Sequence, residues 1–257
     1  MLVSKIETHI LLAAAGSGKR MGADINKQFL KLGGKAVIVR AAESCLNFLD
    51  SLPAETKTGL HIICAEDERE EMKKVLDEAG LKEKITSFIP GGRTRAASVY
   101  NGLTALEEQV EDPSDCLVMV HDGARCLTTK ALFSRCRETA VLYGASCPGI
   151  AVQDTLRKAF APTGQDPVLY ETVPREMLYA MQTPQTFHLD RLLKANRLAR
   201  QKIAEGEISL ASLTDDVSIA QLADITVRLT EGEISNRKIT RPEDLRAAEA
   251  YIKAGLV

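Results

Sequence analysis

The chain has 257 residues, of which 45% are hydrophobic and 4% aromatic, and it contains no tryptophan. This length suits one large domain or two small ones, and the apolar fraction is enough for a sizeable core. The formal net charge of -2 argues against a surface that binds polyanions everywhere, so any anion site must come from local clustering of basic side chains.

Residues 9–16, "HILLAAAG", form a short apolar run that ends at a glycine, which is typical of a buried strand. Further strands are predicted at 59–65, 85–92, 115–125, 145–152 and 224–232. Helices are predicted at 36–49, 67–80, 94–109, 129–144, 188–206, 214–223 and 241–255. Continuous apolar strands that alternate with helices predict an α/β fold, with a Rossmann-like, mostly parallel sheet flanked by helices.

Three polar or basic segments follow predicted strands, at residues 16–27, 91–98 and 121–125. In sheets of this kind ligands bind beyond the carboxyl ends of the strands. We therefore expect these three segments to meet at one site.

Residues 153–175 interrupt the alternation, because two β-rich runs there flank a turn rich in Pro, Gly and Asp. This pattern predicts a hairpin. An isolated hairpin is marginally stable, so it should pack against a partner subunit or against its own domain, and both remain open. We find no repeat or linker and expect one domain over residues 1–257, with an embedded arm at about 153–175.

The glycine-rich stretch at 13–22, "AAAGSGKRMG", fits neither standard phosphate motif. A dinucleotide fingerprint needs a third glycine where Met21 stands, and a P-loop needs glycine at Ala13 and Ser or Thr at Arg20. The glycines still indicate a tight turn whose backbone N–H groups can face an anion. Arg20 and Lys27 could stabilise the negative charge that develops in nucleotidyl transfer.

Seven segments in chain order carry a resemblance to a known family. They are "LAAAGSGKRMG" with "KQFL", "GGRTRAASVYNGL", "VHDGARCL", "AVQDTLRK", "QTPQTF", "TDDVS" and "KITRPEDL". Together they resemble the 2-C-methyl-D-erythritol 4-phosphate cytidylyltransferase family, among the sugar-phosphate nucleotidylyltransferases. The resemblance implies transfer of CMP from CTP to the polyol phosphate, with Mg²⁺ as cofactor, in the non-mevalonate route to isoprenoids.

The resemblance also implies roles for individual residues. Arg20, Lys27 and Lys238 match positions that stabilise charge on the phosphates. The nucleotide-binding positions are Ala14, Ala15, Gly16, Ser17, Gly18, Gly92, Arg93, Arg95 and Ser98. The substrate-binding positions are Asp122, Arg125, Thr155, Arg175 and Thr183. Asp122 would also bind Mg²⁺, and Arg175 would complete the site of the partner in a homodimer joined through the arm.

Some positions depart from the family pattern without removing a charged one. Asn26 stands where the family usually has Pro, and Gly123, Cys126 and Pro174 also differ. The acidic pair in "LTDD" (213–216) could form a second acidic site or cap a helix, and its place before a predicted helix favours the cap. We interpret His121 as structural.

Three other functions are alternatives to the one that the resemblance implies. Ribitol 5-phosphate cytidylyltransferase shares the fold and several segments, although "AAAG" and "NRKITRPEDL" favour methylerythritol phosphate. A scaffold that has lost activity would not need Arg20, Lys27, Asp122 and Lys238. Met21 disfavours a nicotinamide dehydrogenase.

The six cysteines show no spacing typical of a zinc or redox motif, so we expect free thiols and a cytoplasmic location. No apolar run is long enough to span a membrane, and Glu7 argues against a signal peptide in "ILLAAAG". We expect neither a membrane nor a nucleic acid as partner.

Overall fold

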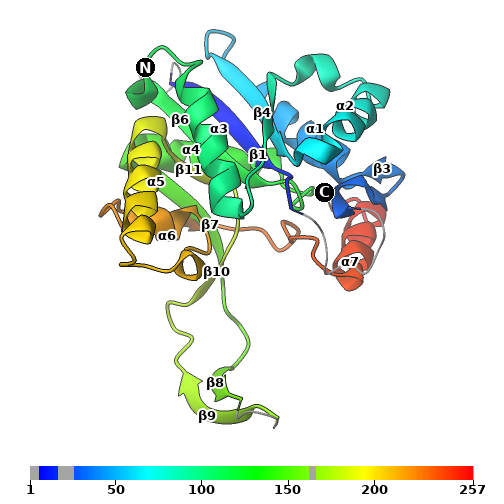
Figure 1. The fold of residues 1–257 in the computed structure, drawn as a ribbon. Coiled ribbons are helices and arrows are strands. Elements are labelled where there is room, and N and C mark those ends of the chain that lie inside the picture. The colour runs from blue at the N-terminus through cyan, green and yellow to red at the C-terminus, as the bar shows by residue number, and fades with distance from the viewer. Residues whose placement is uncertain (1–5, 17–25, 162–165, 257) are drawn as a thin grey trace.

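The computed structural model describes residues 6–16, 26–161 and 166–256, and an eight-stranded sheet forms the centre of this part of the chain (Figure 1). The strands are β1 (Glu7–Ala13), β4 (Thr58–Cys64), β5 (Ser87–Pro90), β6 (Cys116–Asp122), β7 (Ala145–Ala151), β10 (Tyr179–Met181), β11 (Gln185–His188) and β12 (Arg228–Glu231). Their order is β10-β7-β11-β6-β1-β4-β5, and β12 pairs with β7.

The sheet is mostly parallel, as predicted. β1 pairs in parallel with β4 and β6, β4 with β5, and β7 with β12. The exceptions are β10 and β11, which run antiparallel to their neighbours and were not predicted. A short hairpin of β2 (Lys31–Leu32) and β3 (Lys35–Ala36) lies outside this sheet and was also not predicted.

Seven α-helices in the described residues correspond to the predicted ones. They are α1 (Val37–Leu49), α2 (Arg69–Glu78), α3 (Arg95–Glu107), α4 (Lys130–Tyr143), α5 (Leu189–Ala204), α6 (Asp216–Gln221) and α7 (Pro242–Lys253). Asp215 caps α6, because its side chain accepts a hydrogen bond from the Ser218 N–H at 2.9 Å. The interpretation of the acidic pair as a helix cap is therefore confirmed for Asp215.

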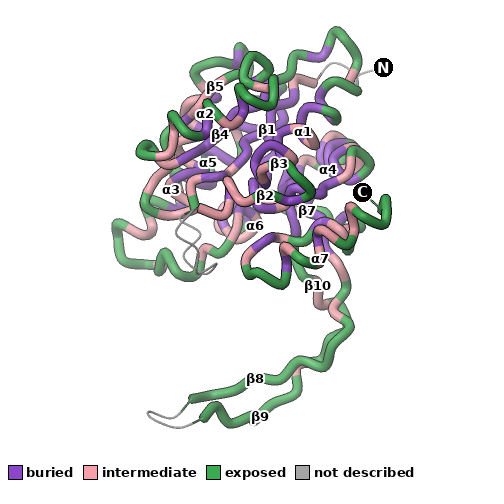
Figure 2. Tube along the Cα trace, turned by 90° about the vertical axis from the view of Figure 1, so that its right-hand side faces the viewer, coloured by how far each residue is buried: buried purple, intermediate pink, exposed green. Residues whose placement is uncertain are grey.

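Side chains of each strand alternate between two hydrophobic layers. Ile10 and Leu12 of β1 pack with α1, α2 and α4, whereas Leu11 packs with α3 and α5. All three are fully buried. Helices thus cover both faces of the sheet, and the carboxyl ends of its parallel strands are left for a site (Figures 1 and 2).

The strands β8 (Leu156–Phe160) and β9 (Val168–Val173) pair with each other as an antiparallel hairpin. Figures 1 and 2 show this arm extending away from the rest of the chain, with almost all of its described residues exposed. Phe160 is 53% exposed and Tyr170 is 58% exposed. In this structure the hairpin does not lie against its own domain.

All six cysteines are free and buried. Burial raises the pKa of the Cys147 thiol to about 12, so it stays protonated and poorly nucleophilic at neutral pH. Within the described residues, none of the helices combines the length and the hydrophobicity that crossing a membrane requires.

Candidate active site

A cavity of about 430 Å³ lies at the carboxyl ends of β1, β5 and β6, where the sequence predicted that three segments would meet. Its described lining consists of Ala13, Ala15, Gly16, Lys27, Gln28, Gly92, Arg93, Thr94, Arg95, Ser98, Asp122, Ala124 and Lys238. Four of these side chains are cationic and one is acidic. Such a lining suits a ligand with several negative charges.

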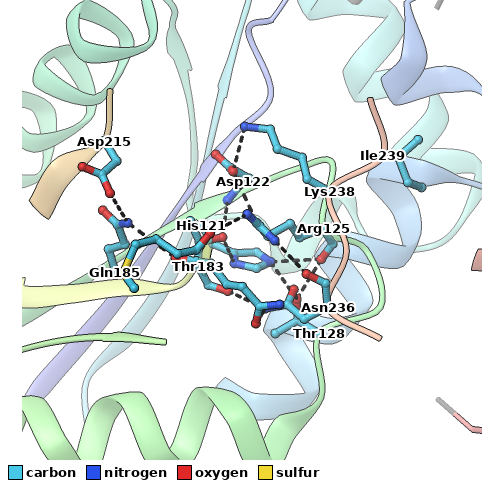
Figure 3. A network of polar contacts seen from close by, with 12 residues as sticks. His121, Asp122, Arg125, Thr128, Thr183, Gln185, Asp215, Asn236, Lys238 and Ile239 are labelled. Carbon is cyan, nitrogen blue, oxygen red and sulfur yellow. Dashed lines mark hydrogen bonds and ion pairs between the residues drawn. The ribbon is translucent and has the colours of Figure 1, made fainter. Parts of the chain in front are cut away.

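Asp122, at the end of β6, is surrounded by three cationic groups, of which Figure 3 shows Arg125 and Lys238. Its carboxylate lies 2.9 Å from Nζ of Lys238, 3.4 Å from Nε of Arg95 and 3.5 Å from Nε of Arg125. Burial alone would raise the pKa of this carboxyl, but the three positive charges outweigh burial and hold the pKa well below its usual range. Asp122 is therefore ionised at neutral pH.

Arg95, in the first turn of α3, bridges two carboxylates. Its Nη2 donates a hydrogen bond to Asp216 at 2.7 Å, and its Nε faces Asp122. Burial lowers the pKa of Arg95, but the two carboxylates outweigh burial and raise it. Asp216 is fully buried, and its other oxygen has no hydrogen-bond partner. The second aspartate of "TDD" thus anchors a cation of the cavity, a role that sequence reasoning missed.

Lys27 and Lys238 reach the cavity through two segments that are bonded to each other. Lys27 begins a short 3-10 helix, η2 (Lys27–Phe29), and its Nζ donates to the backbone oxygen of Ile239 at 3.4 Å. The Ile239 N–H donates in turn to the backbone oxygen of Ala124 at 2.8 Å. These bonds place residues 27, 124 and 238 around the same space.

The turn between β5 and α3 packs closely against the end of β1. A Cβ atom at Gly91 would lie 2.4 Å from the Cβ of Ala15, so only glycine allows this approach. Ser98 Oγ accepts a hydrogen bond from the Gly92 N–H at 2.9 Å and donates to the Thr94 backbone oxygen at 2.9 Å. The double glycine thus brings Gly92 and Ser98 next to Ala15.

His121, Thr183 and Arg125 form a network behind Asp122 (Figure 3). Thr183 Oγ1 accepts from the Asp122 N–H at 3.1 Å and lies 2.9 Å from His121 Nδ1. Burial lowers the pKa of His121 to about 4, so the ring is neutral at pH 7. Arg125 donates to the backbone oxygen of Asn236 at 2.7 Å. These side chains support Asp122, and neither Arg125 nor Thr183 is in the described lining of the cavity.

Several predicted site residues fall elsewhere. Ser17, Gly18 and Arg20 lie outside the described residues. Thr155 and Arg175 are exposed residues on the arm, and Arg175 donates to the backbone oxygen of Gln153. None of the arm's described residues lines the cavity of their own chain. Gln28, which does line it, follows Lys27 directly and was not singled out.

Asp122 is the one acidic group in the described lining, and no three His, Cys, Asp or Glu side chains of the described residues gather as a metal site. Mg²⁺ prefers oxygen ligands, keeps several waters and is often held by one carboxylate together with substrate phosphates. An ionised Asp122 fits this kind of binding, provided that a ligand brings phosphates.

Residues 8–254 match the model of the family described as IspD, 2-C-methyl-D-erythritol 4-phosphate cytidylyltransferase. The protein of this name from Pelotomaculum thermopropionicum is 36% identical over 247 residues, which cover 95% of this chain and 93% of that protein. The one from Parasynechococcus marenigrum is 37% identical over 244 residues, with 95% and 97% covered.

Solved structures show the same likeness. The 2-C-methyl-D-erythritol 4-phosphate cytidylyltransferase from Thermus thermophilus is 29% identical, with a TM-score of 0.67 and 95% and 98% of the two chains covered. The 4-diphosphocytidyl-2C-methyl-D-erythritol synthase from Anaerococcus prevotii has a TM-score of 0.75 at 23% identity, with 98% of each chain covered, and it shows the fold alone.

Proposed function

Because this chain belongs to the 2-C-methyl-D-erythritol 4-phosphate cytidylyltransferase family, we propose that it transfers CMP from CTP to 2-C-methyl-D-erythritol 4-phosphate. The products are 4-CDP-2-C-methyl-D-erythritol and pyrophosphate, in the non-mevalonate route to isoprenoids. The observation that carries this proposal is the cavity, whose described lining contains four cationic side chains, Lys27, Arg93, Arg95 and Lys238, and a single acidic one, Asp122. A triphosphate and a phosphate monoester together supply the negative charge that this lining suits.

In the reaction an oxygen of the substrate phosphate attacks the α-phosphorus of CTP. A new oxygen–phosphorus bond forms, and the bond from the α-phosphorus to the bridging oxygen breaks, so that pyrophosphate leaves with the electron pair. The protein supplies no nucleophile in this scheme. Lys27, Lys238 and Arg20 stabilise the charge on the α-phosphate and on the leaving group, where fixed cations act most strongly in the transition state.

Mg²⁺, when bound, neutralises and aligns the phosphates. Asp122 is the described residue that would hold it, because its carboxylate is ionised and faces the cavity. The Lys238 ammonium, which lies 2.9 Å from the same carboxylate, is positioned to reach phosphates at this point.

The nucleotide would lie between the end of β1 and the turn before α3. The backbone of Ala14 to Gly18 is proposed to face the triphosphate, and Gly92, Arg93 and Ser98 to read the cytosine. Support comes from the close packing of Gly91 against Ala15, which puts both segments around one space. Backbone groups and a serine hydroxyl can offer a fixed donor and acceptor pattern to a pyrimidine edge.

The polyol phosphate is proposed to bind near Arg125 and Thr183, with Thr155 and Arg175 supplied by the arm of a partner subunit. We infer that residues 1–257 form one domain that dimerises through the arm at about 153–175. The exposed Phe160, Leu169 and Tyr170 support this proposal, since an isolated hairpin with apolar side chains needs a surface to pack against. The six buried thiols suit the cytoplasm that we also propose.

A pyrophosphate-release assay tests the proposal. CTP, UTP, ATP and GTP are each combined with methylerythritol 4-phosphate or ribitol 5-phosphate in the presence of Mg²⁺. We expect turnover only with CTP and methylerythritol phosphate. Turnover with ribitol 5-phosphate but not with methylerythritol 4-phosphate would show that ribitol 5-phosphate is the substrate. If no pair releases pyrophosphate, the proposed activity is refuted.

A further inference from the structure

The Asn26 side chain joins three segments next to the cavity. Its Nδ2 donates a hydrogen bond to the Gly16 backbone oxygen at 3.1 Å and lies 2.8 Å from both carboxylate oxygens of Glu68. Its Oδ1 accepts from the Gln28 N–H at 3.2 Å. One carboxamide therefore connects the segment that follows β1, the residue that precedes α2, and the start of η2.

The first and third of these segments both contribute to the lining of the cavity. Gly16 and Lys27 both line the cavity, and the Asn26–Gly16 bond fixes how far apart the backbone at residue 16 and the start of η2 can lie. Glu68 anchors this bond to a segment 42 residues further along the chain. A hydrogen bond to a carboxylate is stronger than one between neutral groups, so the Glu68 carboxylate holds the Asn26 side chain firmly in place.

We propose that Asn26 is a positioning residue for the transfer reaction: it holds Lys27 and the Gly16 backbone at the separation that the phosphates require. The proposal rests on the proposed function for its effect on rate. The bonds themselves can be tested without turnover.

Helix capping alone does not explain the three bonds. The cap needs only an acceptor at Oδ1, and aspartate caps as well as asparagine does. The bonds to Gly16 and Glu68 need the Nδ2 donor, which aspartate lacks. Asn26→Asp therefore keeps the cap, removes the donor and sets a second carboxylate against Glu68.

The experiment compares wild type with Asn26→Asp, Glu68→Gln, and the double variant Asn26→Asp/Glu68→Gln. In the double variant the new amide at residue 68 can donate to the new carboxylate at residue 26. The connection to residue 68 is then restored with the donor reversed, while the bond to the Gly16 oxygen stays lost. Asn47→Asp makes the same charge change at an exposed position of α1 and serves as the control. Steady-state kcat and the KM for CTP are measured, together with hydrogen exchange of the amides at residues 26–30.

For Asn26→Asp we expect kcat to fall by about ten- to hundredfold, because a small displacement of a catalytic cation has effects of this size. The KM for CTP should change less than about threefold, and exchange at 26–30 should speed up. The double variant should recover part of the lost factor in kcat and stay below wild type, because the bond to the Gly16 oxygen is not restored, and Asn47→Asp should behave like wild type.

Two results would overturn the inference. The first is an Asn26→Asp variant with wild-type kcat. The second is a double variant whose kcat is either no higher than that of Asn26→Asp or equal to that of wild type, since the first result would exclude the Glu68 connection and the second would exclude the Gly16 bond. If wild type itself shows no turnover with any substrate pair, the proposed function fails. Unchanged exchange in Asn26→Asp would then separately show that the connection does not hold the segment.

Discussion

The Lys238 ammonium lies 2.9 Å from the Asp122 carboxylate, at the point where the last third of the chain meets the end of β6. Arg95 and Arg125 face the same carboxylate, so one negative charge holds three positive ones beside the cavity. This arrangement keeps the cations close together before any ligand binds. A phosphate ligand that enters meets cations that are already in place.

Asp122→Asn should weaken both the cation cluster and metal binding. We expect kcat to fall by about 100-fold or more, within the range for losing one electrostatic group in an active site. The Mg²⁺ concentration for half-maximal rate should rise by about tenfold. A Mg²⁺ titration of the rate measures both effects, with Asp50→Asn on the exposed end of α1 as control. An unchanged Mg²⁺ dependence would show that Asp122 does not hold the metal.

Lys27→Ala should lower kcat far more than the affinity for CTP. A cation that acts on charge developing in the transition state contributes little to ground-state binding, so we expect a loss of about 100- to 1000-fold in kcat. Arg20→Ala should behave in the same way. Single-turnover kinetics and CTP titration by calorimetry separate the two quantities, and Lys31→Ala at an exposed position is the control. Weaker CTP binding with normal kcat would instead make these residues ground-state ligands.

Asp216→Asn should loosen Arg95. The buried Asp216 carboxylate accepts a 2.7 Å hydrogen bond from Arg95. The neutral amide of the variant would no longer balance the positive charge of Arg95. We expect the KM for CTP to rise by about tenfold, which is the cost of one charge-assisted hydrogen bond to a positioned group. Arg95→Lys should have a similar effect, because lysine cannot reach both carboxylates with a planar fork. If Asp216→Asn leaves the KM for CTP unchanged, Arg95 does not bind the nucleotide.

The stability of the protein should fall in mild acid because of buried histidines. His9 Nδ1 lies 2.9 Å from His61 Nε2. Burial lowers the pKa of both histidines, and that of His61 falls to about 3. In the unfolded chain a histidine has a pKa of about 6.5. Their contribution to stability is thus complete above pH 6.5. Below pH 6.5 the unfolded chain takes up protons that the folded chain does not, and the free energy of unfolding decreases.

For His61 the decrease should approach about 1.4 kcal/mol per pH unit between roughly pH 6 and pH 4, and His9 should add to it in the same direction. Urea unfolding at pH 7.5, 6, 5 and 4 measures it. The His61→Asn variant should show a shallower pH dependence than wild type. Identical slopes in the two proteins would show that protonation of His61 is not linked to unfolding.

Subunits with complementary defects test whether the arm acts across the dimer. Lys27→Ala damages the cavity and Arg175→Ala the arm, so a mixed dimer would contain one site with neither change. Random mixing makes half of the dimers mixed, and each has one intact site of two, so activity should return to about a quarter of wild type. The mixture is refolded together, and its mass is measured by light scattering. No gain over the separate variants would place Arg175 in its own subunit's site or outside the site.

Much of the fold could be predicted because periodic apolar patterns reflect burial directly. The run at residues 9–16 and the one at 115–125 both correspond to central strands, β1 and β6, although each strand ends earlier than predicted, at Ala13 and Asp122. β11 was missed because "QTFH" offers a single large apolar side chain in four residues. It becomes a strand because β6 and β7 both pair with it. This pairing depends on the tertiary structure and leaves no local pattern in the sequence.

Part of the candidate site could also be predicted from the sequence, and part could not. The three predicted segments do meet at one cavity, because strand ends of a parallel sheet share an edge. Two contacts of the site could not be predicted, that of Arg95 with Asp216 and that of Asn26 with Glu68. Each joins residues far apart in the sequence, and local sequence patterns do not predict such contacts. The sequence left open whether the acidic pair of "LTDD" forms a second acidic site or caps a helix, and favoured the cap. Its second aspartate also holds Arg95 through an ion pair, which was not predicted.

The most direct test of the proposed activity is to identify the products formed from CTP and 2-C-methyl-D-erythritol 4-phosphate. Wild-type protein with Mg²⁺ is incubated with both substrates, and the mixture is analysed by ³¹P NMR and mass spectrometry. We predict equal amounts of pyrophosphate and of 4-CDP-2-C-methyl-D-erythritol, with almost none in the Lys27→Ala variant. Unchanged substrates with folded wild-type protein, or hydrolysis of CTP without a CDP-alcohol, would contradict the proposed function.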